Sequence, residues 1–124
     1  MKWLDEVFEK QIDLQKKYRQ IENSELLPDI GLMYASATGM MVEIGEMLQT
    51  DTRWKAITTG SKKQPVCNNI KFIEELSDVF IYLMNVLIYK GVDIDTFKMA
   101  VKAKQNVVER RFNNDNENCD RRAE

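Results

Sequence analysis

The sequence contains no histidine among its 124 residues. This absence excludes from the chain Ser-His and Cys-His nucleophilic catalysis, histidine-ligated zinc and the Glu-x-x-His ligand pairs of ferritin-like di-iron bundles. Any catalysis must therefore use carboxylates, lysine, arginine, tyrosine or a bound metal ion.

Cysteine, glycine and proline are also scarce. The two cysteines, Cys67 and Cys119, fall in a predicted loop and a predicted tail, so neither a disulfide framework nor a zinc site is supported. The chain has five glycines and two prolines against 44% hydrophobic and 31% charged residues, a composition typical of an all-helical soluble protein. Its length suits one domain with a modest core.

Sequence signals for export, membranes and nucleic acid are missing as well. No signal peptide is recognisable, and no apolar run is long and charge-free enough to span a membrane. The formal net charge of −2 gives no basis for nucleic-acid binding. We therefore expect a cytoplasmic protein with neither a membrane nor a nucleic acid as partner.

Apolar periodicity predicts an all-α fold with four helices in one domain, residues 1–112. The helices are expected from Trp3 to about Glu22, from about Asp29 to Leu48, from Asn69 to Lys90, and from Asp93 or Asp95 to Phe112. Residues 50–69 are a predicted polar loop, and residues 113–124 a predicted flexible tail without apolar periodicity.

The third predicted helix is apolar on nearly every side, which indicates burial on most sides. It nevertheless carries Glu75 and Asp78, whose i, i+3 spacing puts both carboxylates within about 60° of each other around the axis. Asn85 falls on the same face. Burying ionised carboxylates is unfavourable unless a cation or hydrogen-bond donors compensate, so a compensating group must lie opposite them.

The second predicted helix supplies a matching pair, Glu43 and Glu46, and its run of small residues indicates a close helix neighbour. If this helix packs antiparallel to the third, the four carboxylates converge. Such a cluster is self-repelling unless divalent cations bind, and all-oxygen ligation suits Mg²⁺ or Mn²⁺. With Lys55 and basic residues of the last helix on a polyphosphate, this predicts metal-assisted attack of water on a phosphoanhydride.

Structural explanations compete with this one. Twenty acids in 124 residues give about three i, i+3 acidic pairs by chance, so surface salt bridges account for such pairs equally well. The pairs Glu6/Glu9 and Glu22/Glu25 are interpreted as solvated. Trp54 is more typical of packing, Asn85 suits a hydrogen bond between helices, and Arg110 suits an exposed helix end.

The combined motif resembles the all-α nucleoside triphosphate pyrophosphatases, which include MazG-like enzymes, dCTP pyrophosphatases and dimeric dUTPases. That family carries E-x-x-E, a spacer, and E-x-x-D; here Glu43-x-x-Glu46 is followed by residues 47–74 and Glu75-x-x-Asp78. The Trp54-Lys55 pair is similar to the dCTP pyrophosphatase and dUTPase branches. Residues 90–93 and 109–112 are similar to MazG.

The resemblance implies a bundle of four or five helices that assembles as a homodimer or homotetramer. It implies Mg²⁺-dependent hydrolysis of a (deoxy)nucleoside triphosphate to the monophosphate and pyrophosphate, in control of nucleotide pools. The four acids would ligate the metal and act in catalysis. The residues implied to bind the nucleotide are Trp54, Lys55, Asn85, Lys102, Asn106 and Arg110.

Two questions stay open at this stage. The base can be cytosine or uracil, as in two branches, or guanine, as in MazG-like enzymes. The alternative function is a non-catalytic helical dimerisation module, in which the third predicted helix is a dimer seam.

Overall fold

A computed structural model describes the backbone of residues 2–123 and the side chains of residues 2–116. The helices are α1 (Lys2–Arg19), α2 (Ile30–Gln49), α3 (Arg53–Thr59), α4 (Asn69–Lys90) and α5 (Ile94–Ala123). Apart from the helices, the described residues form one isolated antiparallel β-bridge, between Asp51 and Cys67. The predicted all-α class is confirmed. The chain divides into two units, Met1–Gly91 and Val92–Glu124.

Helix α4 begins and ends where the sequence predicts. The side chain of Asn68 accepts a hydrogen bond from the backbone N–H of Lys71 at 3.1 Å, which caps the amino end. At the other end Gly91 adopts φ +80°, and its N–H donates to the carbonyls of Leu87 and Ile88. A glycine tolerates this left-handed conformation without steric cost, so it stops the helix after Lys90.

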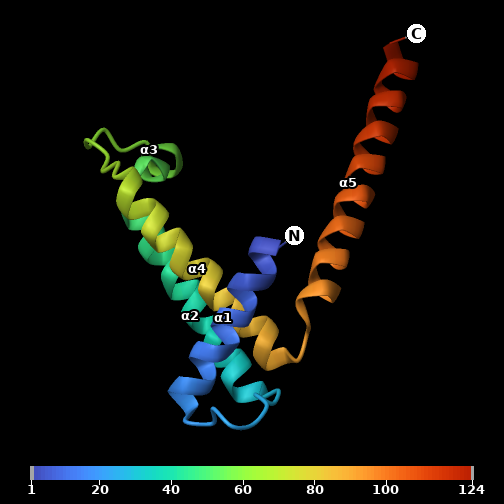
Figure 1. Ribbon diagram of the computed structural model, residues 1–124. Coiled ribbons are helices and arrows are strands. Elements are labelled where there is room, and N and C mark those ends of the chain that lie inside the picture. Colours follow the sequence, from blue (N-terminus) through green and yellow to red (C-terminus); the bar gives the residue numbers. More distant parts are fainter. Residues whose placement is uncertain (1, 124) are drawn as a thin grey trace. The chain divides into compact units, whose positions relative to one another are not determined.

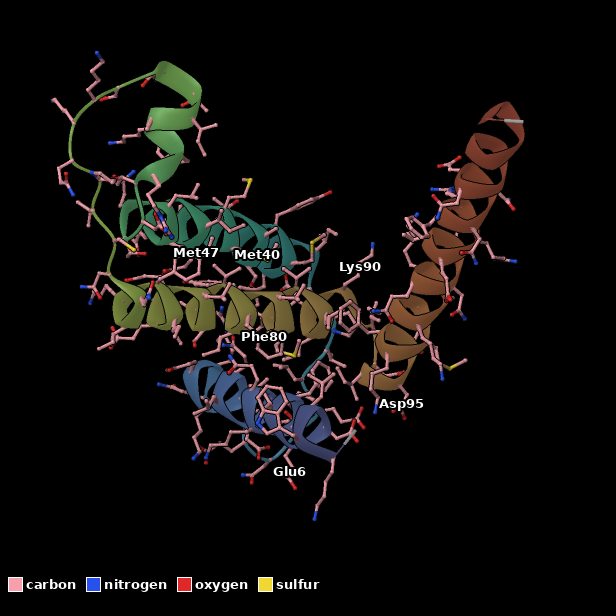
Figure 2. The ribbon with its side chains drawn as sticks, turned by 90° about the horizontal axis from the view of Figure 1, so that it is seen from above. Glu6, Met40, Met47, Phe80, Lys90 and Asp95 are labelled. Atoms are coloured by element: carbon pink, nitrogen blue, oxygen red, sulfur yellow. The ribbon has the colours of Figure 1, made fainter. Side chains whose placement is uncertain are left out.

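Helix α4 is the central element of the first unit. It lies between α1 and α2, which pack on different sides of it (Figure 2). Helix α2 runs antiparallel to α4 along much of its length (Figure 1). Asp29 caps α2 through its side chain and also donates its own N–H to the carbonyl of Tyr89 at 2.9 Å, which ties the start of α2 to the end of α4.

Close approach of α2 to α4 depends on one glycine. A Cβ atom at Gly39 would lie 2.4 Å from the ring of Tyr82, a distance that real Cβ atoms do not show. A Cβ at Gly45, two turns further along α2, would meet nothing within 4 Å. The predicted close neighbour is therefore confirmed at Gly39 and not at Gly45.

The core lies along the carboxyl-terminal half of α4. Its buried apolar residues are Met84, Leu87, Ile88 and Tyr89 of α4 and Phe8 of α1. Nearer the amino end of α1, the rings of Trp3 and Phe80 stack with centroids 6.0 Å apart. The amino-terminal half of α4 exposes Ile70, Ile73 and Leu76, so packing is densest at the end away from Glu75.

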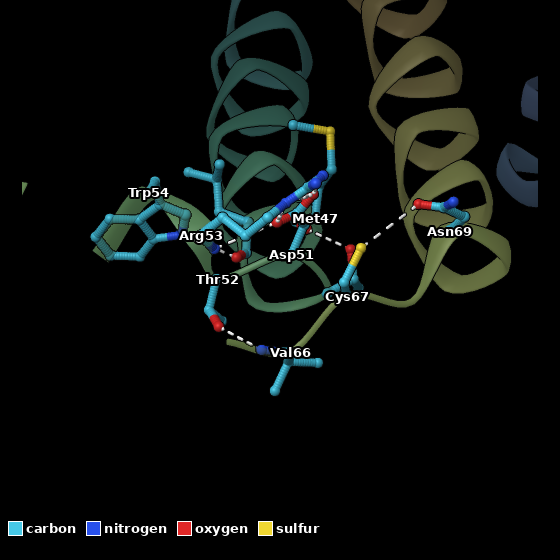
Figure 3. Close-up of polar contacts among 10 residues, drawn as sticks. Met47, Asp51, Thr52, Arg53, Trp54, Val66, Cys67 and Asn69 are labelled. Atoms are coloured by element: carbon cyan, nitrogen blue, oxygen red, sulfur yellow. Dashed lines mark hydrogen bonds and ion pairs between the residues drawn. The ribbon is translucent and has the colours of Figure 1, made fainter. Parts of the chain in front are cut away.

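Part of the predicted loop at residues 50–69 is helical, so that prediction is wrong for α3. This helix ends at Gly60, which has φ +68°, and it contains no internal glycine or proline. The chain returns along the start of α3: Val66 accepts from the N–H of Thr52 at 2.9 Å and donates to its hydroxyl at 2.8 Å (Figure 3). Seven residues are too few to establish a helical period in a sequence.

The second unit consists mainly of α5. Asp93 caps it by accepting the backbone N–H of Thr96 at 2.7 Å, which selects Asp93 over Asp95 as the predicted helix start. The helix was expected to give way to a flexible tail at residues 113–124, and instead it continues to Ala123. No glycine or proline follows Gly91, so nothing in the sequence stops it. The Cys119 side chain and Glu124 lie outside the described residues.

None of the described helices is both long enough and apolar enough to cross a membrane.

Helix α1 ends at Arg19, earlier than the predicted Glu22, and the next residue, Gln20, has φ +59°. A residue with that backbone conformation cannot continue a right-handed helix.

The contact at Gly39 generates a prediction about stability. Gly39→Ala is expected to lower the free energy of unfolding by roughly 1–3 kcal/mol, because the added methyl group displaces the Tyr82 ring. Gly45→Ala is the matched control. It is expected to raise stability by about 1 kcal/mol, because alanine favours helix and meets no neighbour there. Urea unfolding followed by circular dichroism measures both, and equal stabilisation by the two substitutions would contradict the close contact.

Candidate metal centre

The antiparallel pairing of α2 and α4 brings acidic residues of the two helices together. Gly39 of α2 contacts Tyr82 of α4. Glu43 follows Gly39 by four residues on α2, and Asp78 precedes Tyr82 by four residues on α4, so both lie one turn further along the same seam. One carboxylate oxygen each from Glu43, Glu75 and Asp78 lies within 4.8 Å of the other two. The predicted convergence is thus present for three of the four acids.

Glu43 has the least favourable environment of the group. It is half-buried, and its Oε2 atom is buried without a hydrogen-bond partner among the described residues. Burial raises the pKa of Glu43 from 4.5 to about 7, with further contributions from the adjacent Glu46, Glu75 and Asp78. Two ionised carboxylates have no hydrogen-bond donor between them, so Glu43 and its acidic neighbours repel one another unless Glu43 keeps its proton. A proton or a cation is therefore needed here.

Glu46, the fourth predicted ligand, lies one turn along α2 from Glu43 and is exposed. Its charge acts on Glu43, but its oxygens are outside the three-carboxylate group. This places Glu46 at the solvent side of the cluster.

The other acidic pairs behave as predicted for solvated residues. Glu6, Glu9, Glu22 and Glu25 are all exposed, and Glu6 lies 3.9 Å from the Lys2 ammonium. By contrast, none of Glu43, Glu46, Glu75 and Asp78 forms an ion pair among the described residues. Surface salt bridges therefore do not explain the two pairs of the motif.

The donor set fits a hard divalent cation. All candidate ligand atoms are carboxylate oxygens, which Mg²⁺ and Mn²⁺ prefer, and three of them are close enough to share one ion. The unpartnered oxygen of Glu43 is the feature that most favours a ligand, because a buried acceptor without a donor costs stability in the folded chain.

Trp54 and Lys55 lie on α3, within the connection between α2 and α4. The Trp54 indole N–H donates to the carbonyl of Leu48 at 3.0 Å, which ties α3 to the end of α2 (Figure 3). The predicted contact of Trp54 with a nucleotide stays a prediction. The Lys55 ammonium lies 5.6 Å from the centre of the Trp54 ring. Lys55 also lines a cavity of about 290 Å³ together with Lys63.

The connection that carries α3 is also held by charge. Arg53 forms a bidentate ion pair with Asp51, and this guanidinium lowers the pKa of the Asp51 carboxyl (Figure 3). The Cys67 thiol lies 3.9 Å from the Asn69 side-chain oxygen at the start of α4. These contacts fix how the chain passes from α2 to α4, and none of them involves the acidic cluster.

The last three predicted nucleotide contacts belong to the second unit. Lys102, Asn106 and Arg110 are exposed on α5 and follow one another at intervals of four, so they share one side of the helix. Their predicted role stays a prediction.

A larger cavity of about 570 Å³ lies between α1, α2 and α4. Asn85, predicted to contact the nucleotide, lines it and is buried. The same wall contains three buried polar residues that the sequence reasoning missed: Gln11, Gln15 and Ser36. The sequence of α1 contains a signal for the two glutamines. Phe8, Gln11 and Gln15 recur at the three- and four-residue spacing of a buried helix face, and two of these three residues are polar.

Comparisons of this chain with protein-family models, with curated proteins and with solved structures gave no match. The case for a function therefore depends on the geometry of the acidic cluster and its neighbouring cavity, and on the resemblance carried by the motif.

Proposed function

We propose that this chain is a Mg²⁺-dependent (deoxy)nucleoside triphosphate pyrophosphohydrolase, which converts a dNTP and water into a dNMP and pyrophosphate. The observation that carries the proposal is the convergence of Glu43, Glu75 and Asp78, together with a buried oxygen of Glu43 that finds no hydrogen-bond partner among the described residues. These acids belong to the two motif pairs, and the residues between the two pairs include the whole connection from α2 to α4.

Glu43, Glu75 and Asp78 would hold the ion, with Glu46 at the edge of the site. The ion, when bound, neutralises charge on the triphosphate and polarises the phosphoryl group under attack. Mn²⁺ offers the same oxygen-ligand chemistry and is expected to substitute.

Water is the nucleophile in the proposed reaction, because the chain has no histidine to activate a serine or cysteine. Its oxygen forms a bond to the α-phosphorus, and the bond from that phosphorus to the α–β bridging oxygen breaks. Glu46 is the first choice for the carboxylate that orients the water and takes its proton, because it is exposed beside Glu43. Pyrophosphate leaves with its charge balanced by basic side chains, among which Lys55 is the candidate in the first unit.

The 570 Å³ cavity suits the base of the nucleotide. Asn85 in its wall follows Asp78 by two helical turns, about 10 Å along the axis of α4. A nucleotide bound along α4 can therefore place its phosphates at the acids and its base at Asn85. The proposal covers cytosine, uracil and guanine nucleotides alike.

Assembly as a homodimer or homotetramer is part of the proposal. Large apolar side chains are exposed on the first unit: Tyr34, Met41 and Val42 of α2, and Ile73 and Ile81 of α4. The same exposure favours the alternative function, a non-catalytic helical dimerisation module. The two functions differ in one measurable property, the release of pyrophosphate from a nucleotide.

Amide substitution of the acids tests the metal centre. Glu43→Gln, Glu75→Gln and Asp78→Asn are each expected to lower kcat/KM for a dNTP by roughly a hundredfold or more, because each removes a ligand charge from the site. Glu46→Gln is expected to lower kcat to a similar extent. Pyrophosphate release with Mg²⁺ across a panel of NTPs and dNTPs provides the measurement.

Glu6→Gln and Glu9→Gln are the matched controls on exposed α1, and both should retain wild-type turnover. Near-normal hydrolysis by Glu75→Gln would show that the assigned site is wrong. A wild-type chain that hydrolyses no nucleotide would favour the dimerisation module.

The raised pKa of Glu43 predicts how the metal-free protein responds to pH. A carboxyl with a pKa of 4.5 when unfolded and about 7 when folded binds its proton more tightly in the folded state. Its contribution to stability is therefore complete below pH 4.5 and is lost as the pH rises to about 7. In EDTA, Glu43→Gln should be increasingly more stable than wild type as the pH rises through this range. Thermal unfolding at pH 5 and pH 8 measures the difference, and a constant difference would contradict the burial of Glu43.

Isotope labelling locates the bond that is cleaved. Hydrolysis in ¹⁸O-labelled water should place the label in the monophosphate, because water attacks the α-phosphorus in the proposed reaction. Mass spectrometry of the products gives the answer. Label found only in the pyrophosphate would move the attack to the β-phosphorus, and release of single phosphate would exclude the proposed reaction class.

A further inference from the structure

The connection between α2 and α4 encloses a cavity of about 290 Å³ whose charged lining residues are all basic. Its polar lining consists of Gln49, Thr52, Lys55, Ser61, Lys63 and Gln64. The sequence from residue 52 to residue 68 contains four basic residues and no aspartate or glutamate. In a chain with a net charge of −2, this cavity is therefore a locally basic site.

The two lysines at the cavity have no anionic partner. Neither Lys55 nor Lys63 forms an ion pair among the described residues. The acid that precedes them in the sequence, Asp51, is already held by Arg53 in a bidentate ion pair. Two ammonium groups at one cavity repel each other, and an anion bound there removes that repulsion.

Two hydroxyl groups of the lining also have a hydrogen left to donate. The Thr52 oxygen accepts the backbone N–H of Val66 at 2.8 Å, and the Ser61 oxygen accepts the backbone N–H of Lys63 at 3.3 Å. Neither hydroxyl donates to an acceptor among the described residues. Because a hydroxyl accepts and donates at the same time, each has one donor available for a ligand in the cavity.

The course of the chain brings these donors to one cavity. Gly60 ends α3 with φ +68°, and the returning segment is tied to Thr52 by the two hydrogen bonds of Val66 (Figure 3). Lys55 on α3 and Lys63 on the returning segment therefore line the same space. None of the acids of the candidate metal centre takes part in this arrangement.

We propose that this cavity binds a phosphate group without a metal ion, either as free phosphate or as the end of a polyphosphate. A phosphate group accepts hydrogen bonds in several directions at once, which suits two ammonium groups and two hydroxyls on different walls. A carboxylate offers only two oxygens in one plane, and a metal cation is repelled by the lysines. Lysine is an established phosphate binder because its ammonium is a compact charge with three donors.

The cavity adjoins the candidate metal centre but is separate from it. Gln49 in its lining follows Glu43 by six residues, about 9 Å along the axis of α2. With EDTA present, the acids of the metal centre carry no cation and repel anions. Phosphate binding in EDTA therefore reports on the cavity alone. The inference does not rest on the proposed function, and a chain that hydrolyses no nucleotide would leave it standing.

Thermal unfolding of the whole chain in EDTA tests the wild-type site. Millimolar phosphate and pyrophosphate are each expected to raise Tm in a saturable way, because a ligand of the folded state stabilises it. Sodium acetate at matched ionic strength should give no such rise. A larger effect of pyrophosphate would identify a polyphosphate end as the ligand, and equal effects would identify free phosphate. An equal Tm in all three salts would overturn the inference.

Substitution of the lysines separates the site from general salt effects, since phosphate also stabilises proteins through exclusion from their surface. Lys55→Gln and Lys63→Gln are each expected to weaken pyrophosphate binding by roughly tenfold, because each removes a charged donor. Lys63→Arg should retain binding, since it keeps the charge. Unchanged binding in both glutamine variants would overturn the inference.

Lys10→Gln and Lys17→Gln are the matched controls, because they remove the same charge at exposed positions of α1. Both should bind pyrophosphate as the wild type does. A loss in these controls as large as that in Lys63→Gln would overturn the inference, because net charge alone would then explain the binding. Should Lys55→Gln lose helix content by circular dichroism, since Lys55 contacts the Trp54 ring, Lys63→Gln decides.

Discussion

The antiparallel contact of α2 with α4 is the constraint on which both candidate sites depend. Gly39 against Tyr82 fixes its register, because only a residue without a side chain fits beneath that ring. Moving along the seam in one direction leads to Glu43 with Glu75 and Asp78, and moving in the other leads to Ser36 and Asn85. A shift of one residue along either helix would rotate both sets out of line, since helical neighbours recur every three or four residues. One contact therefore sets the separation of the acids from the cavity.

The acidic cluster is held together by packing at a distance from it. Its members repel one another, and burial raises the pKa of Glu43 to about 7, so the cluster itself opposes folding without a metal. The buried residues of the carboxyl-terminal half of α4, together with the link from Asp29 to the carbonyl of Tyr89, supply the compensating stability. This arrangement separates the stable end of the unit from the end where charge is concentrated.

The sequence predicted the parts of the structure that local chemistry determines. Asn68 and Gly91 specify the limits of α4 because a side-chain cap and a left-handed glycine act within one turn. The i, i+3 spacing of Glu75 and Asp78 specifies a shared face for the same reason. Helix α3 was missed because it is too short to show a period. The extent of α5 was missed because the absence of a helix-stopping residue is a weaker signal than the loss of apolar spacing.

What the sequence reasoning missed in the site depends on tertiary register. Gln11 and Gln15 occupy core positions of α1, but only the packing of α1 against α4 shows that they meet Asn85 and Tyr89. An apolar side chain at either position would satisfy the local pattern better, but it would leave Asn85 or Tyr89 without its hydrogen-bond partner. Departures from local consistency concentrate at functional sites in natural proteins. Here the amides of the cavity and the unpartnered oxygen of Glu43 are two such departures on adjoining parts of one helix seam. Their coincidence favours a single ligand that spans both, with a neutral polar end and a multiply charged one.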